Sequence, residues 1–539
     1  MSRTYGAGSE EMAGLWRQRL DFLRNPASYA DGSTQVDCVE THMSWVFLTA
    51  RYAYKLKKPV TFGFVDFSSL DSRYAACREE IRLNQRLAPD VYLGLTPLTI
   101  DRQGQRHLGG AVMVEEWLVR MRRLPADRCL TRLIADKKLA PRDVESLAER
   151  LWQFYRGLPP VSCRADEYRQ AILRHVEDNR RELVDRAFLP EGRVNRIVAL
   201  QRRLLVLHPQ LFDVRVCDGR IIEGHGDLRP EHVYFAPKPV VIDALEFSRE
   251  LRVLDVVDEL CFFAMECAVA DAADVGYEVL ERYQRASQDR PPTELLAFYE
   301  TYRALVRAKV AVLRSLQQPW ESPATDACRV SALRYVAWAD RRLSGLMRPL
   351  LLVVMGGSGT GKSTLAGELE RELAAYRLGT DALRRFELFQ GDSGNGFDRG
   401  RYAPAERARV YQHLRESAIA ALSQRATVVV DGTFGDAEER QSIYQAARRV
   451  DADVVFIECR CPLELARERV AKRRSTHESE IRPEQLEQQA RKRAPLSDEL
   501  PTIVVDTSTD VATALSETIV ALQSFVMNPG TRTSSTVTS

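Results

Sequence analysis

The sequence predicts two domains of different architecture, an α+β domain followed by an α/β domain. In residues 35–60, short runs of β-branched and aromatic residues are broken by turns, which is typical of a small antiparallel sheet. From residue 348 onward, apolar runs alternate with helical stretches, which is typical of a parallel sheet with flanking helices. The 539 residues are also too many for a single hydrophobic core.

Short strands and long helices are expected in the first domain, residues 35–345, which a lead-in helix within residues 1–34 precedes. Strand-like runs are recognised by β-branched and aromatic residues, and helices by apolar residues at helical spacing. The expected strands lie at 35–40, 45–50, 52–60, 95–100, 111–119 and 239–247. Helices are expected over 69–87 and through most of 128–208.

Four continuous apolar runs predict the buried parallel strands of the second domain, residues 346–526. These runs lie at 349–357, 426–434, 452–460 and 500–508. Runs of this kind are typical of strands that are covered on both faces. The final residues, 527–539, are rich in Ser and Thr and are expected to be disordered.

Charge and composition restrict the class of protein. The 77 basic and 75 acidic residues argue against a nucleic-acid partner held by net charge, although a local basic groove stays open. No apolar run approaches the roughly 20 residues that span a bilayer, so we expect a cytoplasmic protein without a membrane partner. The ten cysteines lack metal-ligand spacing and are expected to be reduced thiols.

The stretch "GGSGTGKST" fits the pattern G-x-x-x-x-G-K-S, between an apolar strand and a helix. Backbone N–H groups of such a loop wrap phosphates, Lys362 reaches the β and γ oxygens, and Ser363 ligates Mg²⁺. The motif predicts a P-loop that binds ATP. The expected nucleotide-binding residues are Gly356, Gly357, Ser358, Gly359, Thr360, Gly361, Lys362, Ser363 and Thr364.

Three further features of the second domain could carry its chemistry. "LGTDALRR" places Asp381 and Arg384 just after a short second strand. Asp431 ends the strand in "VVVDGTF", where it could act near Mg²⁺ or could simply cap a helix or turn. An arginine cluster follows in "CPLELARERVAKRRST", which is either a lid over the phosphates or a solvated basic face. Its members are Arg467, Arg469, Arg473 and Arg474.

Together these motifs resemble small P-loop kinases of the gluconate, adenylylsulfate, zeta-toxin and polynucleotide 5′-kinase type, over roughly residues 349–525. The resemblance implies that Asp381 holds or deprotonates the acceptor hydroxyl and that Arg384 binds the acceptor. It also implies that lid arginines such as Arg469 and Arg473 close over the transferring phosphate.

The stretch "EGHGDLRPEHVYF", residues 223–235, is typical of a kinase catalytic loop, and Asp227 is its candidate base. Asp243 in "VVIDALEF" follows a strand at a distance that suits a metal ligand. In "YAYKLKK", Lys55 and Lys57 share one face of a strand. Lys55 is favoured for pairing with ATP phosphates, and Glu80 on the next helix, ahead of Glu79, as its ion-pair partner.

These stretches resemble the aminoglycoside phosphotransferase and choline-kinase family over roughly residues 35–345, in a bacterial group often fused to a P-loop kinase. The resemblance implies a bilobal, protein-kinase-like fold. The family pattern is HGDxxxxN, and its asparagine binds a second metal; here the place is taken by His232. Three interpretations stay open: a kinase with altered metal occupancy, one that borrows Glu231, or a nucleotide-binding pseudokinase. His225 is expected to brace the loop.

The function expected from the sequence is transfer of the γ-phosphate of ATP to a hydroxyl of a small molecule, at least by the P-loop domain. ATP and Mg²⁺ are the expected cofactors, with Ser363, Asp431, Asp243 and His232 as candidate metal ligands. Two other functions stay open. One is a polynucleotide 5′-kinase, and the other is a regulatory protein that nucleotide switches, with a pseudokinase as its first domain.

Overall fold

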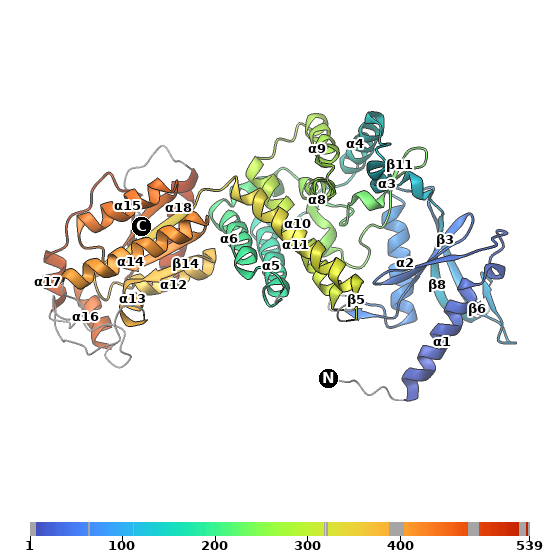
Figure 1. Cartoon of the computed structure of the whole chain (residues 1–539), viewed down its shortest axis with the longest axis horizontal. Helices are drawn as coiled ribbons and strands as arrows, with labels where there is room; N and C mark the ends of the chain where they lie inside the picture. Colours follow the sequence, from blue (N-terminus) through green and yellow to red (C-terminus); the bar gives the residue numbers. More distant parts are fainter. Residues whose placement is uncertain are drawn as a thin grey trace. The chain divides into compact units, whose positions relative to one another are not determined.

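The structure is a computed structural model with two compact units (Figure 1). The first unit comprises residues 1–163 and 215–303, and the second comprises residues 164–214 and 304–539. The predicted domain bounds, 35–345 and 346–526, stay predictions. The described residues are 7–62, 65–110, 113–186, 188–316, 318–319, 322–386, 404–472, 485–527 and 535–536.

A six-stranded antiparallel sheet forms the first part of the first unit, with the strand order β1-β2-β3-β8-β6-β7. Helix α2 (Leu70–Asn84) begins where the side chain of Ser69 accepts a hydrogen bond from Ser72 N–H, and it packs on β6 and β8. The strands and the preceding helix are α1 (Ala7–Arg24), β1 (Asp37–Glu40), β2 (Ser44–Leu48), β3 (Tyr52–Lys57), β4 (Thr61–Phe62), β5 (Val65–Asp66), β6 (Tyr92–Ile100), β7 (Arg106–Leu108) and β8 (Met113–Arg122).

The second part of the first unit is mainly helical, and beside the predicted catalytic loop it carries the short hairpin β10-β11 and the antiparallel strand pair β9-β12. Helix α8 is capped by Asp255, whose carboxylate accepts a hydrogen bond from Val257 N–H. The elements are α3 (Leu130–Ala135), α4 (Pro141–Arg156), β9 (Ile221–Glu223), β10 (Val233–Phe235), β11 (Pro239–Val241), β12 (Val253–Asp255), α8 (Val256–Val269) and α9 (Ala273–Ser287). Helices α7 (Gln210–Cys217) and α10 (Thr293–Ser315) each contain residues of both units.

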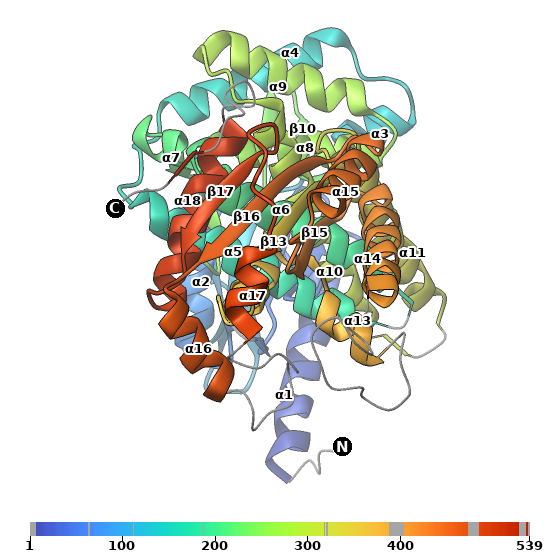
Figure 2. The ribbon, with the colours of Figure 1, turned by 90° about the vertical axis from the view of Figure 1, so that its left-hand side faces the viewer.

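A parallel sheet forms the centre of the P-loop part of the second unit, with the order β14-β15-β13-β16-β17-β18. Its strands lie between helices in Figure 2. The elements are β13 (Leu350–Met355), α12 (Lys362–Leu373), β14 (Tyr376–Gly379), α13 (Thr380–Phe386), α14 (Pro404–Ser423), β15 (Thr427–Gly432), α15 (Ala437–Arg449), β16 (Asp453–Arg460), α16 (Leu463–Lys472), α17 (Leu486–Arg491), β17 (Thr502–Asp506), α18 (Val511–Met527) and β18 (Ser535–Thr536).

Strand β13 is buried on both faces, which explains its continuous apolar run. Leu351 and Val353 belong to the core cluster that includes residues of α14 and α15, whereas Leu350 and Leu352 belong to the cluster that includes residues of α12 and α18. Leu207 joins the second cluster, so α6 packs with the P-loop core. The other helices of this unit are α5 (Ala165–Val184), α6 (Glu191–Leu207) and α11 (Pro323–Ser344).

The predicted fold class is confirmed: an antiparallel sheet with a helical region, as in a kinase, precedes a P-loop domain with a parallel sheet. Residues 535–536 of the predicted disordered tail pair with β17, and most of that tail lies outside the described residues. None of the ten cysteines, all of which lie in the described residues, forms a disulfide bond. Within the part of the chain that the structure describes, every helix is too short or too polar to cross a membrane.

Candidate active sites

The P-loop connects the end of β13 at Met355 to the start of α12 at Lys362. Gly359 and Gly361 have φ angles of +78° and +81°, in the left-handed region that glycine adopts without strain. A Cβ atom on Gly359 would lie 2.5 Å from the carbonyl oxygen of Ala466, so only glycine fits there. Lys362 lies at the positive end of the α12 dipole, as phosphate binding requires.

Ser363 lies within hydrogen-bond distance of a strand-end carboxylate. Its Oγ donates to Asp431 Oδ1 at 3.0 Å, and Asp431 is 3% exposed at the end of β15. Arg377 Nε and Nη2 lie 2.9 and 2.8 Å from Asp431 Oδ2. Asp431 therefore lies inside a strand beside the P-loop hydroxyl and caps no helix. Hydroxyl and carboxylate oxygens are ligands that suit Mg²⁺, so the two side chains fit this metal.

The predicted acceptor residues lie on helix α13, which follows β14 directly. Arg384 Nη1 lies 2.9 Å from Asp381 Oδ1, and Arg384 is buried. Gly379 pairs with Asp431 in the parallel sheet. The start of α13 therefore lies at the carboxyl ends of the strands, where the P-loop also begins.

Arg469 projects from α16 against the P-loop. Its Nη2 donates to the carbonyl oxygen of Thr507 at 2.9 Å, and its Nη1 lies 3.6 Å from where a Cβ on Gly361 would be. Arg467 forms an ion pair with Glu487. The predicted lid residues Arg473 and Arg474 lie outside the described residues.

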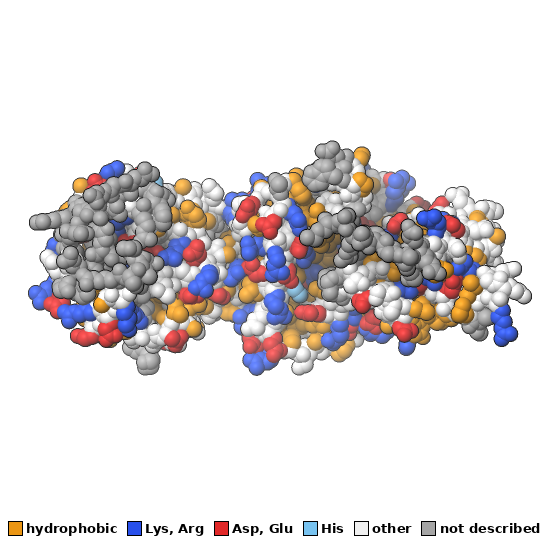
Figure 3. All heavy atoms as spheres, turned by 90° about the horizontal axis from the view of Figure 1, so that it is seen from below, with side chains coloured by type: hydrophobic (Ala, Val, Ile, Leu, Met, Phe, Trp, Pro, Cys, Tyr) orange, Lys and Arg blue, Asp and Glu red, His pale blue; other side chains and the backbone are white. Residues whose placement is uncertain are grey.

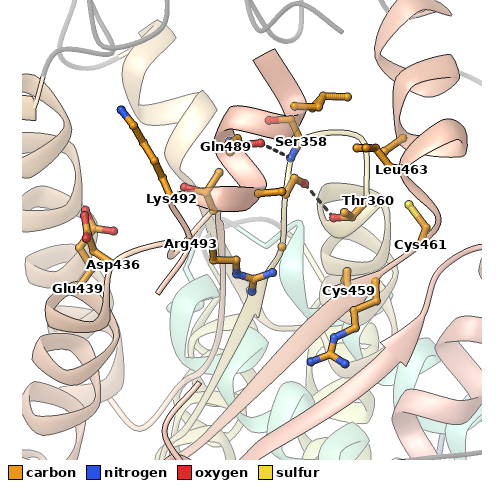
Figure 4. Close-up of a pocket in the computed structure, with 18 of the residues that line it drawn as sticks. Ser358, Thr360, Asp436, Glu439, Cys459, Cys461, Leu463, Gln489, Lys492 and Arg493 are labelled. Carbon is orange, nitrogen blue, oxygen red and sulfur yellow. Dashed lines mark hydrogen bonds between the residues drawn. The ribbon is translucent and has the colours of Figure 1, made fainter. Parts of the chain in front are cut away.

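A cavity of about 630 Å³ opens beside the first residues of the P-loop (Figure 4). Figure 4 shows the Gln489 side chain directed at the loop, and its Oε1 accepts a hydrogen bond from Ser358 N–H at 2.9 Å. Arg493 projects into the cavity and its Nη1 lies 2.8 Å from Glu458 Oε1. Gln489 and Arg493 belong to no motif, so neither residue is predicted from the sequence.

Glu439 from α15 also lines this cavity. Its pKa is raised to about 7, chiefly by burial and then by the nearby Asp436, against the opposing effects of Arg407 and Arg384. Its proton is therefore held more tightly in the folded than in the unfolded chain. The resulting loss of stability develops as the pH rises from about 4.5 to about 7 and is complete above that range.

Glu439→Gln is therefore expected to stabilise the second unit by about 1–3 kcal/mol at pH 8 and to have little effect at pH 4.5. Urea unfolding at both pH values measures this difference. Glu438→Gln is the matched control, since Glu438 is the exposed neighbour. An equal effect of Glu439→Gln at both pH values would contradict the assigned pKa.

In the first unit, the predicted ion pair between β3 and α2 is present. Lys55 Nζ lies 2.8 Å from Glu80 Oε1 and 2.6 Å from Asp243 Oδ1. Burial opposes the charge on Asp243, but Lys55 and then His232 outweigh it, so the pKa of Asp243 lies well below its usual range. Asp243 is thus a carboxylate at neutral pH, and its oxygens fit a Mg²⁺ ion.

Lys57, predicted as a nucleotide ligand, lies in the protein interior. Its side chain is fully buried, and its Nζ lies 2.7 Å from Glu80 Oε2 and 2.5 Å from Glu246 Oε1. Glu80 therefore joins the two lysines. This position gives Lys57 the task of holding Glu80 in place, while Lys55 extends toward Asp243.

The predicted catalytic loop is braced from two sides. His225 Nε2 lies 3.0 Å from the carbonyl oxygen of Ile242, and Asp227 N–H donates to His225 Nδ1 at 3.3 Å. Burial is the main cause that lowers the pKa of His225 to about 3, so the ring is neutral. On the other side, Gly226 N–H donates to the buried Glu259 at 2.6 Å. His225 thus has the bracing contacts that the sequence predicts.

A buried arginine that was not predicted as a site residue lies beside Asp227. Arg229 Nη2 lies 2.9 Å from Asp227 Oδ2 and 3.0 Å from His232 Nε2, and its Nη1 pairs with Glu231. His232 Nδ1 in turn lies 2.9 Å from the carbonyl oxygen of Asp227. The position of Arg229, two residues after the candidate base, is the sequence feature that could have indicated this contact.

The comparisons with known proteins identify relatives of both units. A family model described as an AAA domain (AAA_33) matches residues 351–496, which confirms the P-loop domain. The uncharacterized proteins Rv2004c of Mycobacterium tuberculosis and Mb2027c of Mycobacterium bovis are 31% identical over 448 residues, covering 81% of this chain and 86% of theirs.

Two solved structures of kinases align with different parts of the chain. A choline/ethanolamine kinase family protein from Mesorhizobium loti aligns over 61% of this chain and 99% of its own, with 13% identity and a TM-score of 0.36. A gluconokinase from Sinorhizobium meliloti aligns over 34% of this chain and 97% of its own, with 21% identity and a TM-score of 0.27.

Proposed function

This chain belongs to the family of the mycobacterial proteins Rv2004c and Mb2027c, and we propose that it is an ATP-dependent phosphotransferase. Its second unit transfers the γ-phosphoryl group of ATP to a hydroxyl of a small molecule, and its first unit holds a second ATP site. The observation that carries this proposal is the hydrogen bond of 3.0 Å between Ser363, in an intact P-loop, and Asp431 at the end of β15.

The candidate site residues of the second unit each have a defined task in this reaction. The backbone N–H groups of the P-loop and the Lys362 ammonium hold the phosphates of ATP. Ser363 and Asp431 would hold Mg²⁺, which neutralises charge on the phosphate oxygens. Arg384 holds Asp381 at 2.9 Å, so that this carboxylate faces the acceptor from a fixed position.

The bond changes balance without a further reactant. The acceptor oxygen bonds to the γ-phosphorus while the bond from that phosphorus to the β–γ bridging oxygen breaks. ADP leaves with the electron pair, and Asp381 takes the proton of the acceptor hydroxyl. Arg469, which already lies against Gly361, adds positive charge near the transferring group.

The surface charge favours a small acceptor over a nucleic acid. The cavity of about 630 Å³ lies beside Gly356, Gly357 and Ser358, and its described lining does not include Asp381 or Arg384, so the acceptor is not assigned from its size. On the face shown in Figure 3, basic and acidic side chains are interspersed, in keeping with 77 basic and 75 acidic residues. This pattern does not favour binding along the backbone of a nucleic acid, which requires a continuous basic track.

In the first unit, Lys55 would contact the ATP phosphates, Asp227 the acceptor hydroxyl, and Asp243 a Mg²⁺ ion. The support for these roles is the bridge that Lys55 makes between Glu80 and Asp243, at 2.8 and 2.6 Å. In kinases an ion pair of this kind aligns the lysine for the phosphates.

The proposed activity is tested by incubating the full chain with γ-labelled ATP and a pool of hydroxylated metabolites. In a chain that also carries Asp227→Ala, we expect a labelled product, and we expect Asp381→Asn to lower its yield at least a hundredfold while ATP binding persists. Asp498→Asn, a change at an exposed aspartate, is the matched control. Label that appears only in inorganic phosphate would contradict the proposal, and label on oligonucleotide 5′ ends would favour a polynucleotide kinase.

A further inference from the structure

The cluster around Arg229 bears on how many metal ions the first unit uses. Arg229 is 6% exposed, and its guanidinium group contacts the carboxylates of Asp227 and Glu231. The next carboxylate is Asp243, whose Oδ2 lies 3.6 Å from His232 Nε2. The positively charged Arg229 guanidinium therefore lies among the carboxylates that could otherwise bind metal ions.

Both ring nitrogens of His232 take part in hydrogen bonds within the loop. The carbonyl oxygen of Asp227 only accepts hydrogen bonds, so Nδ1, at 2.9 Å from it, must carry the hydrogen. A guanidinium group only donates, so Nε2 accepts from Arg229 Nη2 at 3.0 Å. The single lone pair of the ring is thereby used on Arg229. His232 has no lone pair left for a metal ion.

In the family pattern the asparagine at this position binds a second metal ion. His232 does not fit that role. Mg²⁺ also prefers oxygen ligands to the nitrogen that His232 could offer. Glu231, the alternative ligand, forms an ion pair with Arg229 instead.

We propose that the Arg229 guanidinium, held by His232, replaces the second divalent ion, and that ATP in the first unit is bound with one Mg²⁺ at Asp243. This inference rests on the ATP site assigned above to the first unit. Arg229 neutralises charge at the place where a two-ion site would use a metal. A guanidinium group suits this task because it is always charged and binds phosphate oxygens through paired N–H groups.

The test counts bound metal ions in the full chain. Lys362→Ala/Ser363→Ala removes the metal and phosphate ligands of the P-loop, so the remaining site is that of the first unit. Mn²⁺ is titrated with a non-hydrolysable ATP analogue, free Mn²⁺ is measured by electron paramagnetic resonance, and analogue binding is measured separately. We expect one Mn²⁺ per chain, and its loss in the same background with Asp243→Asn.

A second variant shows whether Arg229 is the reason for this count. Adding Arg229→Met and His232→Asn to the same background removes the cation and restores an oxygen ligand, so two Mn²⁺ per chain are expected. Two ions with Arg229 intact, or one ion with and without it, would overturn the inference. If the analogue does not bind at all, the ATP site proposed for the first unit fails as well, and this outcome is recognised from the separate binding measurement.

Discussion

Lys362→Ala is expected to lower the rate of phosphoryl transfer by the second unit by about a thousandfold or more. Lys362 is the only charged side chain of the motif "GGSGTGKST", and it begins helix α12 with 7% of its surface exposed. Its ammonium group would contact the β and γ oxygens, where charge changes during the transfer. Removing one such preorganised charge typically costs several kcal/mol of transition-state stabilisation.

The measurement is the initial rate of labelled product formation, in a chain that also carries Asp227→Ala to silence the first unit. Lys138→Ala, a change at a lysine whose side chain is 71% exposed in the first unit, is the control for loss of a positive charge. If turnover of ATP survives Lys362→Ala and disappears with Asp227→Ala alone, then the main activity belongs to the first unit and our assignment is wrong.

Local patterns in the sequence were sufficient to predict the fold and the P-loop. The apolar run before Gly356 became β13, and the alternation in "YAYKLKK" became β3. Such patterns work because a strand buried on both faces needs an apolar side chain at almost every position. The P-loop motif is similarly local, since its glycines, lysine and serine are consecutive in the chain.

Contacts between distant residues explain what the sequence left undecided. Gln489 reaches Ser358 across 131 positions, and Glu246 reaches Lys57 across 189. The two members of each pair lie in different stretches of the chain, so no motif spacing predicts that they meet. Lys57 illustrates the consequence: its place on the strand suggested a nucleotide ligand, whereas its surroundings make it a buried cation.

Arg229 differs from these residues because it lies within the quoted loop. The motif pattern identifies His232 as an altered metal ligand. The sequence does not show that the side chains of Arg229 and His232 contact each other. A hydrogen bond of 3.0 Å joins Arg229 and His232, so these two unusual residues of the loop act together. Side-chain direction within a short loop is decided by packing, which spacing alone does not encode.

Lys57→Met is expected to destabilise the first unit by about 3–5 kcal/mol. The substitution leaves Glu246 without its ammonium partner and Glu80 with Lys55 alone, in a region where burial penalises the charged form of each group. Burial lowers the pKa of Lys57, but Glu246 and Glu80 outweigh burial, so that the pKa lies above its usual value in the folded protein. Breaking a buried pair costs more than the pair contributes, because the remaining charge stays desolvated.

Urea unfolding, followed by tryptophan fluorescence, measures this loss, since Trp16, Trp45, Trp117 and Trp152 all lie in the first unit. Lys58→Met is the matched control: its ammonium pairs with Glu40, whose side chain is 62% exposed, so a change below about 1 kcal/mol is expected. Lys57→Met/Glu246→Gln, which removes the stranded charge, should recover part of the loss. If Lys57→Met unfolds at the same urea concentration as Lys58→Met, the buried network does not stabilise this unit, and Glu80 must be held in place by Lys55 alone.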